Sequence, residues 1–242
     1  MILIENLTKR FGELVAVDAL NLEIGTGEFF AFLGPNAAGK TTTIKTLVGL
    51  LKPTQGRAQL CGYDIQRDYL KAKTLLSYIP DAPFLYDKLT GAEFLDFVLN
   101  LYPSSNREKQ MKMKDELLFQ FGLDNHKYHL IENYSHGMRQ KLVFAAALLH
   151  EPKVMIIDEP MVGLDPHSSR IVKDILKQKS RQGVTIFLST HTLNVAEEIA
   201  DRIGIIDKGR LIAVGTLEEL KVSSGVHGKL EDVFLRLTEE ES

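Results

Sequence analysis

The 242-residue sequence contains a single cysteine, Cys61. No intrachain disulfide can form, which excludes a small secreted scaffold held together by disulfides. The chain also has no apolar run approaching the roughly 18 residues of a membrane-spanning helix, since its longest such run is Leu142–Leu149. Its N-terminal segment has no apolar core of signal-peptide length. From these absences we expect a soluble, cytoplasmic chain.

The sequence shows no marked excess of either charge. Its 29 Lys and Arg residues against 32 Asp and Glu residues give a formal net charge of −3. This is not the basic footprint of a nucleic-acid-binding protein, so we expect no nucleic-acid partner. No internal repeat and no low-complexity block is visible. With 44% hydrophobic residues, the chain has an ordinary globular composition and enough length for a sizeable core.

The first part of the chain has the alternating pattern of half-buried strands. Leu20, Leu22 and Ile24 are apolar, and the residues between them are polar. Such alternation predicts a strand with one face in the core. Residues 1–7 read as its partner, with a turn at 11–13. We therefore expect an antiparallel sheet at the start of the chain.

The rest of the chain has the pattern of a mostly parallel sheet with crossover helices. Four short apolar runs predict strands buried on both faces, and helical stretches separate them. These runs are Phe29–Leu33, Val154–Ile157, Val184–Leu188 and Ile203–Ile206. A helix that follows the first run has apolar residues at Ile44, Leu47, Val48 and Leu51, and we expect Pro53 to end it.

The middle of the chain, residues 90–150, has helical periodicity and no strand pattern. Apolar residues recur there at the spacing of helix faces, which is typical of core packing. We therefore expect an all-helical insertion in the α/β core. Its three stripes are Phe94, Leu95, Val98 and Leu101; Leu117, Leu118 and Phe121; and Met138, Leu142, Ala145, Ala146 and Leu149.

A phosphate-binding loop follows the first buried strand. Residues 34–41, Gly-Pro-Asn-Ala-Ala-Gly-Lys-Thr, fit the G-x4-G-K-[ST] pattern. The pattern stands between a predicted strand and a predicted helix, which is the context that it requires. Backbone N–H groups of such a loop converge on an anion. Lys40 would contact the β- and γ-phosphates, and the Thr41 hydroxyl would bind Mg2+.

A second carboxylate for Mg2+ is expected at the end of a neighbouring strand. Residues 153–158 end an apolar run with Asp158, at the edge where open α/β sheets bind ligands. Glu159 follows at once. Two adjacent acids at a buried strand end are costly unless they serve a cation or a water molecule. The sequence therefore predicts a P-loop nucleotide hydrolase.

With these motifs in order, the sequence resembles the nucleotide-binding subunit of ABC transporters along nearly its whole length. Residues 134–140, Tyr-Ser-His-Gly-Met-Arg-Gln, look like the signature motif that is specific to ABC ATPases. Residues 163–165 look like the D-loop, and His191 matches the switch histidine. The tail at 230–235 resembles the ends of drug- and polysaccharide-exporter subunits.

The resemblance implies a role for each matching residue. Glu159 would polarise the attacking water, His191 would hold it with the γ-phosphate, and Asp165 would couple two sites. Asp81 and Asp158 would join Thr41 at Mg2+. The expected ATP-binding residues are Phe11, Gly34, Asn36, Ala37, Ala38, Gly39, Lys40, Thr41, Thr42, Ser135, His136 and Gly137.

Three positions depart from the family pattern. Asp81 stands where the family usually has a glutamine that touches Mg2+, so we expect altered Mg2+ dependence. Ala37 replaces a common glycine, and it would cost about 1 kcal/mol only if its backbone is left-handed. His136 replaces a glycine or lysine of the signature. It is either a solvated loop residue or a pH-sensitive contact to phosphate.

The resemblance also implies partners. The signature of one subunit caps the nucleotide of another, so we expect a head-to-tail dimer with a second copy or a paralogue around two ATP molecules. Because nucleotide would bind only the closed dimer, its binding would stabilise that dimer by mass action. Multi-spanning permease subunits would place the chain on the inner face of the cell membrane. Residues 81–89 would either meet that permease or pack the insertion onto the core.

Three interpretations of the function stay open at this point. The first is the energising subunit of a transporter, more specifically an exporter. The second is a soluble ABC ATPase that acts as a regulator or assembly factor, and the third is a nucleotide-binding partner with weak hydrolysis. The expected organisation is one ABC ATPase domain, residues 1–242. It comprises an α/β core at 1–89 and 151–220, a helical signature subdomain at 90–150, and a tail at 221–242.

Overall fold

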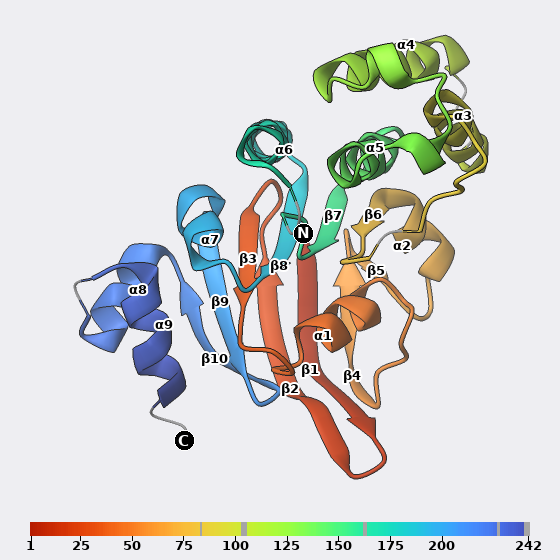
Figure 1. Cartoon of the computed structure of the whole chain (residues 1–242). Coiled ribbons are helices and arrows are strands. Elements are labelled where there is room, and N and C mark those ends of the chain that lie inside the picture. The colour runs from red at the N-terminus through yellow and green to blue at the C-terminus, as the bar shows by residue number, and fades with distance from the viewer. Residues whose placement is uncertain (83, 103–105, 162–163, 227, 240–242) are drawn as a thin grey trace.

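The computed structural model describes residues 1–82, 84–102, 106–161, 164–226 and 228–239. Within these residues the strands form two sheets, one four-stranded and one six-stranded. Figure 1 shows the helical insertion above the sheets and the C-terminal helices to one side. Three buried clusters fill the space between the insertion and the six-stranded sheet, between the two sheets, and under the C-terminal helices.

The four-stranded sheet is antiparallel and has the order β2-β1-β4-β5. It confirms the predicted opening sheet, and Leu20, Leu22 and Ile24 are buried while Asn21 and Glu23 are exposed. Alternation therefore identified the core face correctly. The strands are β1 (Ile2–Phe11), β2 (Leu14–Ile24), β4 (Gln55–Leu60) and β5 (Tyr63–Asp64).

The six-stranded sheet has the order β10-β9-β3-β8-β7-β6, and only the β9–β10 pair is antiparallel. The four predicted strands are confirmed, whereas β6 and β10 were not predicted. The first is only four residues long, and the second is an edge strand of half-exposed residues. The strands are β3 (Phe29–Leu33), β6 (Leu76–Ile79), β7 (Val154–Asp158), β8 (Thr185–Thr190), β9 (Arg202–Asp207) and β10 (Arg210–Gly215).

The helix after β3 is shorter than predicted. It ends at Leu47, because Gly49 takes a φ of 74° that turns the chain out of the helix, so Leu51 and Pro53 lie beyond its end. The helices outside the insertion are α1 (Lys40–Leu47), α2 (Tyr69–Leu75), α6 (Pro166–Arg181), α7 (Leu193–Ile199), α8 (Leu217–Ser224) and α9 (Leu230–Glu239).

The insertion is helical as predicted, and an isolated bridge between Thr90 and Leu130 is its one β-type contact among the described residues. One predicted core residue is wrong: Leu101 is 60% exposed, and Leu99 is buried in its place. The first helix starts with a capping box between Thr90 and Glu93. The elements are α3 (Gly91–Leu101), α4 (Arg107–Gln120), η1 (Asp124–His126), η2 (Ile131–Asn133) and α5 (His136–Leu148).

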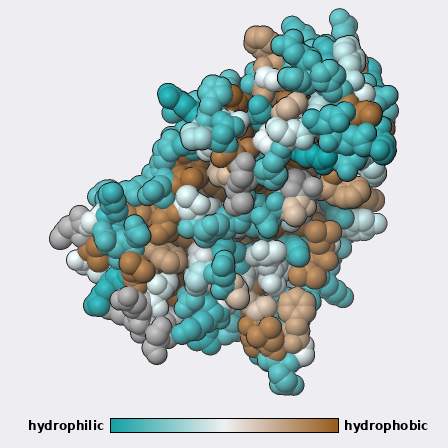
Figure 2. All heavy atoms as spheres, viewed as in Figure 1, coloured by the Kyte–Doolittle hydropathy of each residue, from teal (hydrophilic) through white to brown (hydrophobic). Residues whose placement is uncertain are grey.

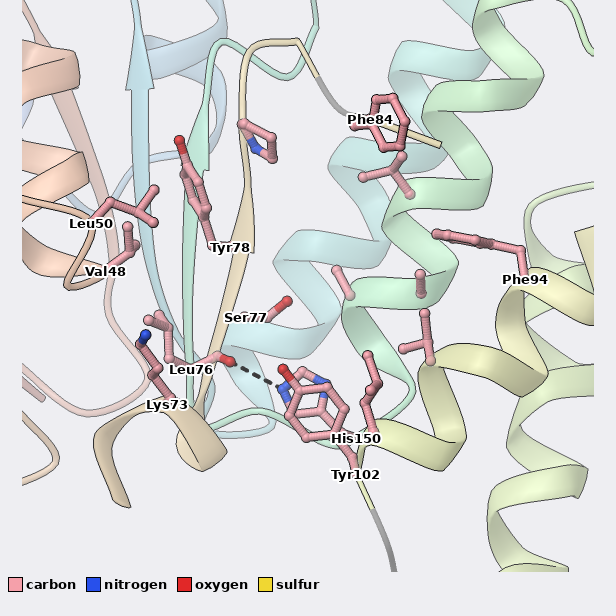
Figure 3. A pocket seen from close by; sticks show the side chains of 16 residues that line it. Val48, Leu50, Lys73, Leu76, Ser77, Tyr78, Phe84, Phe94, Tyr102 and His150 are labelled. Atoms are coloured by element: carbon pink, nitrogen blue, oxygen red, sulfur yellow. Dashed lines mark hydrogen bonds between the residues drawn. The ribbon is translucent and has the colours of Figure 1, made fainter. Parts of the chain in front are cut away.

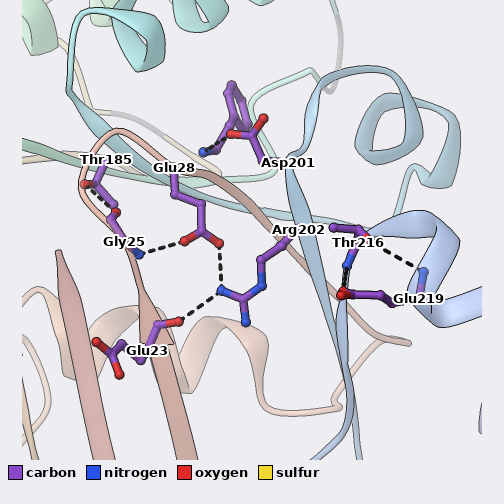
Figure 4. A network of polar contacts seen from close by, with 9 residues as sticks. Glu23, Gly25, Glu28, Thr185, Asp201, Arg202, Thr216 and Glu219 are labelled. Atoms are coloured by element: carbon purple, nitrogen blue, oxygen red, sulfur yellow. Dashed lines mark hydrogen bonds and ion pairs between the residues drawn. The ribbon is translucent and has the colours of Figure 1, made fainter. Parts of the chain in front are cut away.

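A polar network fixes the edge of the central sheet at which its parallel strands begin (Figure 4). The Arg202 guanidinium donates to the Glu28 carboxylate at 2.9 Å, and the other oxygen of Glu28 accepts from the Gly25 N–H at 2.7 Å. These contacts hold the β2–β3 connection against the start of β9. The opposite edge, at which the parallel strands end, carries the candidate site.

Candidate functional site

The phosphate-loop residues lie between the end of β3 and the start of α1. Gly34 has no room for a side chain, because a Cβ there would lie 2.3 Å from the Ile206 carbonyl oxygen. Gly39 takes a φ of 108° and would bring a Cβ within 2.5 Å of the Ala16 carbonyl oxygen. Both glycines of the motif are therefore required by close backbone packing as well as by the backbone turn.

The backbone at Ala37 is left-handed, with a φ of 64°. This settles the conditional expectation from the sequence, since an L-residue in this conformation costs about 1–2 kcal/mol. Ala37 and its neighbour Asn36 are exposed, whereas Ala38 is buried. The strain therefore sits on the outer side of the loop, at the candidate nucleotide cavity.

The Lys40 ammonium lies inside the loop. It donates to the carbonyl oxygens of Gly34 at 2.6 Å and Pro35 at 3.0 Å. Burial lowers the pKa of Lys40, and the negative charges of Glu159 and Asp158 partly offset this effect. The lysine is thus held between the loop carbonyls and the two acids.

Asp158 ends β7 and is almost fully buried, at 2% exposure. The Ser189 hydroxyl donates to it at 2.6 Å, because Asp158 and Ser189 are register partners on β7 and β8. Burial raises the pKa of Asp158, while hydrogen bonds from Ser189 and Thr41 lower it. The charges of Glu159 and Asp81 add to the upward pKa shift.

Glu159 and His191 are in direct contact. The His191 Nδ1 atom lies 2.9 Å from Glu159 Oε1, and the His191 backbone N–H donates to the other carboxylate oxygen at 3.3 Å. Glu159 takes a φ of 49°, a conformation that a non-glycine residue rarely adopts. Its N–H donates to the Ser189 carbonyl oxygen at 3.0 Å, which fixes the turn after β7.

Asp81 lies close enough to this cluster to act on it electrostatically. Its charge helps to raise the pKa of Asp158 and, with burial as the main cause, the pKa of Tyr78 to about 12. The Asp81 side chain itself is exposed. The carboxylates of Asp81, Asp158 and Glu159 therefore share one edge of the central sheet with Lys40 and Thr41.

A cavity of about 270 Å³ opens beside the phosphate loop. Phe11 is 46% exposed there, and the Lys9 ammonium lies 4.9 Å from the centre of its ring. Figure 2 shows hydrophobic residues among hydrophilic ones over the lower part of the β1–β2 hairpin. The described residues that line the cavity are Phe11, Leu14, Ala16, Ala37, Ala38, Gly39, Lys40, Thr41 and Thr42.

The candidate signature residues lie elsewhere, at the start of α5. Ser135 caps this helix by accepting the Met138 N–H at 3.3 Å, and Ser135 and His136 are exposed. A Cβ on Gly137 would lie 3.9 Å from the Asp165 carboxylate, which itself caps α6 through Ser168. The chain thus brings the signature and Asp165 together, and neither lines the cavity beside the phosphate loop.

The structure adds residues that the motifs did not identify as part of the site. Ser189 is the register partner of Asp158, and this pairing follows only from the strand order. Gln140 is buried, and its amide donates to the Pro160 carbonyl oxygen at 3.3 Å, which links α5 to the residue after Glu159. Gly163 of the predicted D-loop lies outside the described residues.

A groove of about 420 Å³ lies between the core and the insertion (Figure 3). His150 and Tyr102 stack at its lower end, with ring centres 4.0 Å apart, and His150 bonds the Leu76 carbonyl oxygen at 3.1 Å. Phe84 is 81% exposed at the opposite end, whereas its neighbour Leu85 is buried. Segment 81–89 therefore both packs onto the core and presents an apolar side chain; Pro83 lies outside the described residues.

Across the described ranges, none of the helices has the length and apolar character needed to cross a membrane. The same residues contain no group of three or more His, Cys, Asp or Glu side chains arranged around a metal position. The oxygen donors near Asp158 are instead a mixture of carboxylates and the Thr41 hydroxyl.

Comparisons with known proteins agree on one family. A sequence model of the ABC transporter family matches residues 17–162. An uncharacterised ABC transporter ATP-binding protein of Bacillus subtilis, YhcH, is 39% identical over 89% of this chain and 70% of its own length. The daunorubicin resistance ATP-binding protein DrrA3 of Streptomyces coeruleorubidus is 37% identical over 97% of this chain and 73% of its own length.

Solved structures agree as well. The ATP-binding subunit of an ABC transporter superimposes with a TM-score of 0.93 at 31% identity, covering 98% of this chain and 99% of that one. The ATP-binding cassette MJ0796, dimeric and bound to ADP and Pi, superimposes with a TM-score of 0.80 at 26% identity, covering 90% and 99%. The chain therefore belongs to the ABC transporter family and is an ATP-binding subunit that hydrolyses ATP.

Proposed function

We propose that this chain powers the export of drug-like compounds through separate membrane subunits. Relatives with drug-resistance names support the direction of transport, and they include daunorubicin resistance proteins of two Streptomyces species. The proposal also gives the chain a peripheral position on the inner face of the cell membrane. Its permease partners would bind in the groove between the core and the insertion.

One observation carries the proposed mechanism. Lys40, Asp158 and Glu159 share one edge of the sheet, whereas Ser135 to Gly137 begin α5 and do not line the cavity beside the phosphate loop. An exposed helix start with a serine cap offers N–H groups to an anion. A second subunit, arranged head to tail, would bring its signature to the nucleotide of the first, so that two ATP molecules lie in the dimer interface.

The proposed chemistry follows from positions and charges. The loop N–H groups and Lys40 would hold the phosphates, and the Phe11 ring would stack on the base. Glu159 would polarise the attacking water, since its carboxylate is beside the edge and is oriented by His191 at 2.9 Å. Positioning and charge neutralisation supply most of the catalysis in phosphoryl transfer.

The residues near Asp158 fit a magnesium ion. Asp158 is buried, burial raises its pKa, and the negative charges of Glu159 and Asp81 raise it further, so a cation bound here would relieve the repulsion among the three carboxylates. Carboxylate and hydroxyl oxygens are the ligands that Mg2+ prefers. Asp158, Thr41 and Asp81 would hold the ion, which when bound neutralises charge on the β- and γ-phosphates.

We propose the same division of the domain as the sequence predicts. Residues 1–89 and 151–220 would form the nucleotide-binding core, residues 90–150 the signature subdomain, and residues 221–242 the tail. The groove lies where core and insertion meet, which supports a coupling role for segment 81–89. The exposed rings of Phe84, Tyr86 and Phe97 contact one another edge to face, and a contiguous group of exposed apolar side chains is typical of a surface that binds a partner.

The test uses a tagged Glu159→Gln chain expressed in its native cell and purified from detergent-solubilised membranes with Mg-ATP. A multi-spanning protein that copurifies supports the proposal, and Phe84→Asp in the same background should reduce its recovery. Lys112→Asp, on the exposed face of α4, is the matched control and should leave recovery unchanged. Recovery only from the soluble fraction, with an assembly or ribosomal partner, would replace the export proposal by the regulator interpretation.

A further inference from the structure

Three backbone segments that are distant in sequence meet behind the phosphate loop. They are the bend of β2 at Ala16, the loop glycine Gly39, and the β9–β10 turn at Gly209. A Cβ on Gly39 would lie 2.5 Å from the Ala16 carbonyl oxygen, and a Cβ on Gly209 would lie 3.0 Å from the same atom. A Cβ on Gly39 would also lie 3.5 Å from the Gly209 Cα atom, so the β9–β10 turn packs against the loop; Figure 1 shows this turn near the start of α1.

The turn also bonds the loop. The Gly209 N–H donates to the Ala38 carbonyl oxygen at 2.9 Å. In a trans peptide the C=O and the following N–H point in opposite directions. The Gly39 N–H therefore points away from Gly209, and Ala38, Gly39 and Lys40 all line the candidate nucleotide cavity.

The Gly39 N–H is available to a ligand. No acceptor for it occurs among the hydrogen bonds of the described ranges. It belongs to the N–H groups before and at the start of α1, which have no partner within the helix. An N–H group at this place is suited to a phosphate oxygen, provided that its peptide plane is held in the correct orientation.

The turn is itself anchored to β2. The Asp18 N–H donates to the Gly209 carbonyl oxygen at 2.8 Å. The Asp18 carboxylate accepts from the Arg210 Nε and Nη2 atoms at 3.0 and 2.8 Å. Both backbone polar groups of Gly209 are thus hydrogen-bonded. Its N–H bonds the phosphate loop, and its C=O bonds β2.

We propose that Gly209, anchored by Asp18 and Arg210, is a positioning residue for ATP binding. It fixes the Ala38–Gly39 peptide so that the Gly39 N–H meets a phosphate oxygen. The inference rests on the proposed role of the phosphate loop and adds to it a contact from outside the motif. Glycine is favoured at 209 because its φ is 82° and because a Cβ there would lie only 3.0 Å from the Ala16 carbonyl oxygen, which is tighter than an ordinary contact.

The main test compares Gly209→Ala with Gly62→Ala. Gly62 has the same φ of 82°, but a Cβ there meets nothing within 4 Å, and it lies in the β4–β5 turn. Both variants carry the same backbone strain, and Gly209→Ala adds the close contact with the Ala16 backbone, so its loss of thermal stability should be the larger and nucleotide binding is compared at a temperature where both variants are folded. Only Gly209→Ala should weaken nucleotide binding, because a charge-assisted hydrogen bond that is partly lost lowers affinity by roughly three- to tenfold.

Pyrophosphate separates a phosphate effect from an effect on the base. In Gly209→Ala the inhibition constant of pyrophosphate and the KM for ATP should rise in the same proportion, with kcat changed less. Phe11→Ala should raise the KM for ATP and leave pyrophosphate inhibition unchanged. Equal KM values in Gly209→Ala and Gly62→Ala would overturn the inference.

The side-chain anchor gives a second test if Gly209→Ala does not fold. Arg210→Ala should raise both constants about twofold, as expected for a partly exposed ion pair, and Arg210→Lys should recover part of the loss. Unchanged constants in Arg210→Ala would count against the anchor. Lys40→Ala separates a failure of the inference about Gly209 from a failure of the proposed phosphate loop. If Lys40→Ala leaves nucleotide affinity unchanged, the phosphate-loop assignment is wrong, and the inference about Gly209 fails with it.

Discussion

Replacing Ala37 by glycine should stabilise the protein. Ala37 has a φ of 64°, which costs an L-residue about 1–2 kcal/mol relative to its relaxed conformation. Glycine removes this strain, but it makes the unfolded chain more flexible by about 0.4–1 kcal/mol. Taken at the middle of each range, the two effects leave a net stabilisation of roughly 0.8 kcal/mol. For a chain of this length, that corresponds to an increase in Tm of about 1–4 °C.

Ala38 is the matched control for this prediction. It is the next residue, it is 3% exposed, and it is not among the described residues with a positive φ. Ala38→Gly gains no relief of strain, adds the same unfolded-state flexibility and removes a buried methyl group. Its Tm should therefore fall below that of the parent chain, while the Tm of Ala37→Gly rises.

The assay is thermal unfolding followed by circular dichroism, with nucleotide and Mg2+ omitted so that ligand binding does not shift the Tm. Urea unfolding of the same proteins gives the free energy of unfolding without the temperature scale. If Ala37→Gly has the same Tm as the parent or a lower one, the left-handed backbone is not a source of strain. The same conclusion follows if Ala38→Gly is stabilised as much.

Further expectations concern the acids and one histidine. Glu159→Gln should lose about 100-fold or more of the ATPase rate and keep its affinity for ATP, as measured by phosphate release and by fluorescent-nucleotide binding. Asp81→Gln should shift the Mg2+ titration of ATPase activity, and an identical titration curve would contradict a role for Asp81 at the ion. Burial lowers the pKa of His150 from 6.5, so the unfolded chain takes up a proton that the folded chain resists. Stability should therefore fall as the pH drops below about 6.5, and the fall should be smaller in His150→Gln when unfolding is measured from about pH 7.5 to 5.5.

The sequence predicts the parts of this fold that local chemistry controls. The strand Phe29–Leu33 is predicted to the residue, because a wholly apolar run before a glycine loop has few other solutions. Helix ends are predicted less accurately. The spacing of Leu51 continues the apolar pattern of the helix, but the positive φ of Gly49 ends the helix before Leu51 is reached. The prediction that Leu101 is buried is wrong for a similar reason. Periodicity identifies the apolar face of a helix, but it does not show how far along the helix neighbouring elements cover that face.

The candidate site divides along the same line. Its motif residues can be found from sequence because each motif is one continuous segment, which follows or ends a strand for Gly34–Thr41 and Asp158–Glu159 and begins a helix for Ser135–Gly137. The sequence alone does not determine whether the backbone of Ala37 is left-handed. Its φ of 64° is seen only in the folded loop between β3 and α1. The contact of 2.9 Å between Glu159 and His191 joins the ends of β7 and β8, and its existence depends on those strands being neighbours.

The remaining contacts cannot be predicted from sequence motifs, and the contacts among Asp18, Gly209 and Arg210 show why. Asp18 belongs to the antiparallel sheet, whereas Gly209 and Arg210 belong to a hairpin at the far edge of the central sheet. They meet at the phosphate loop because β9 lies beside β3, so that the turn after β9 lies level with the loop after β3. A motif records residues that touch a ligand from one segment of chain. The groups that orient those residues belong to other segments, which the strand order places next to the motif. The role of Gly209 becomes visible only in the structure, where a Cβ on this residue would lie 3.0 Å from the Ala16 carbonyl oxygen.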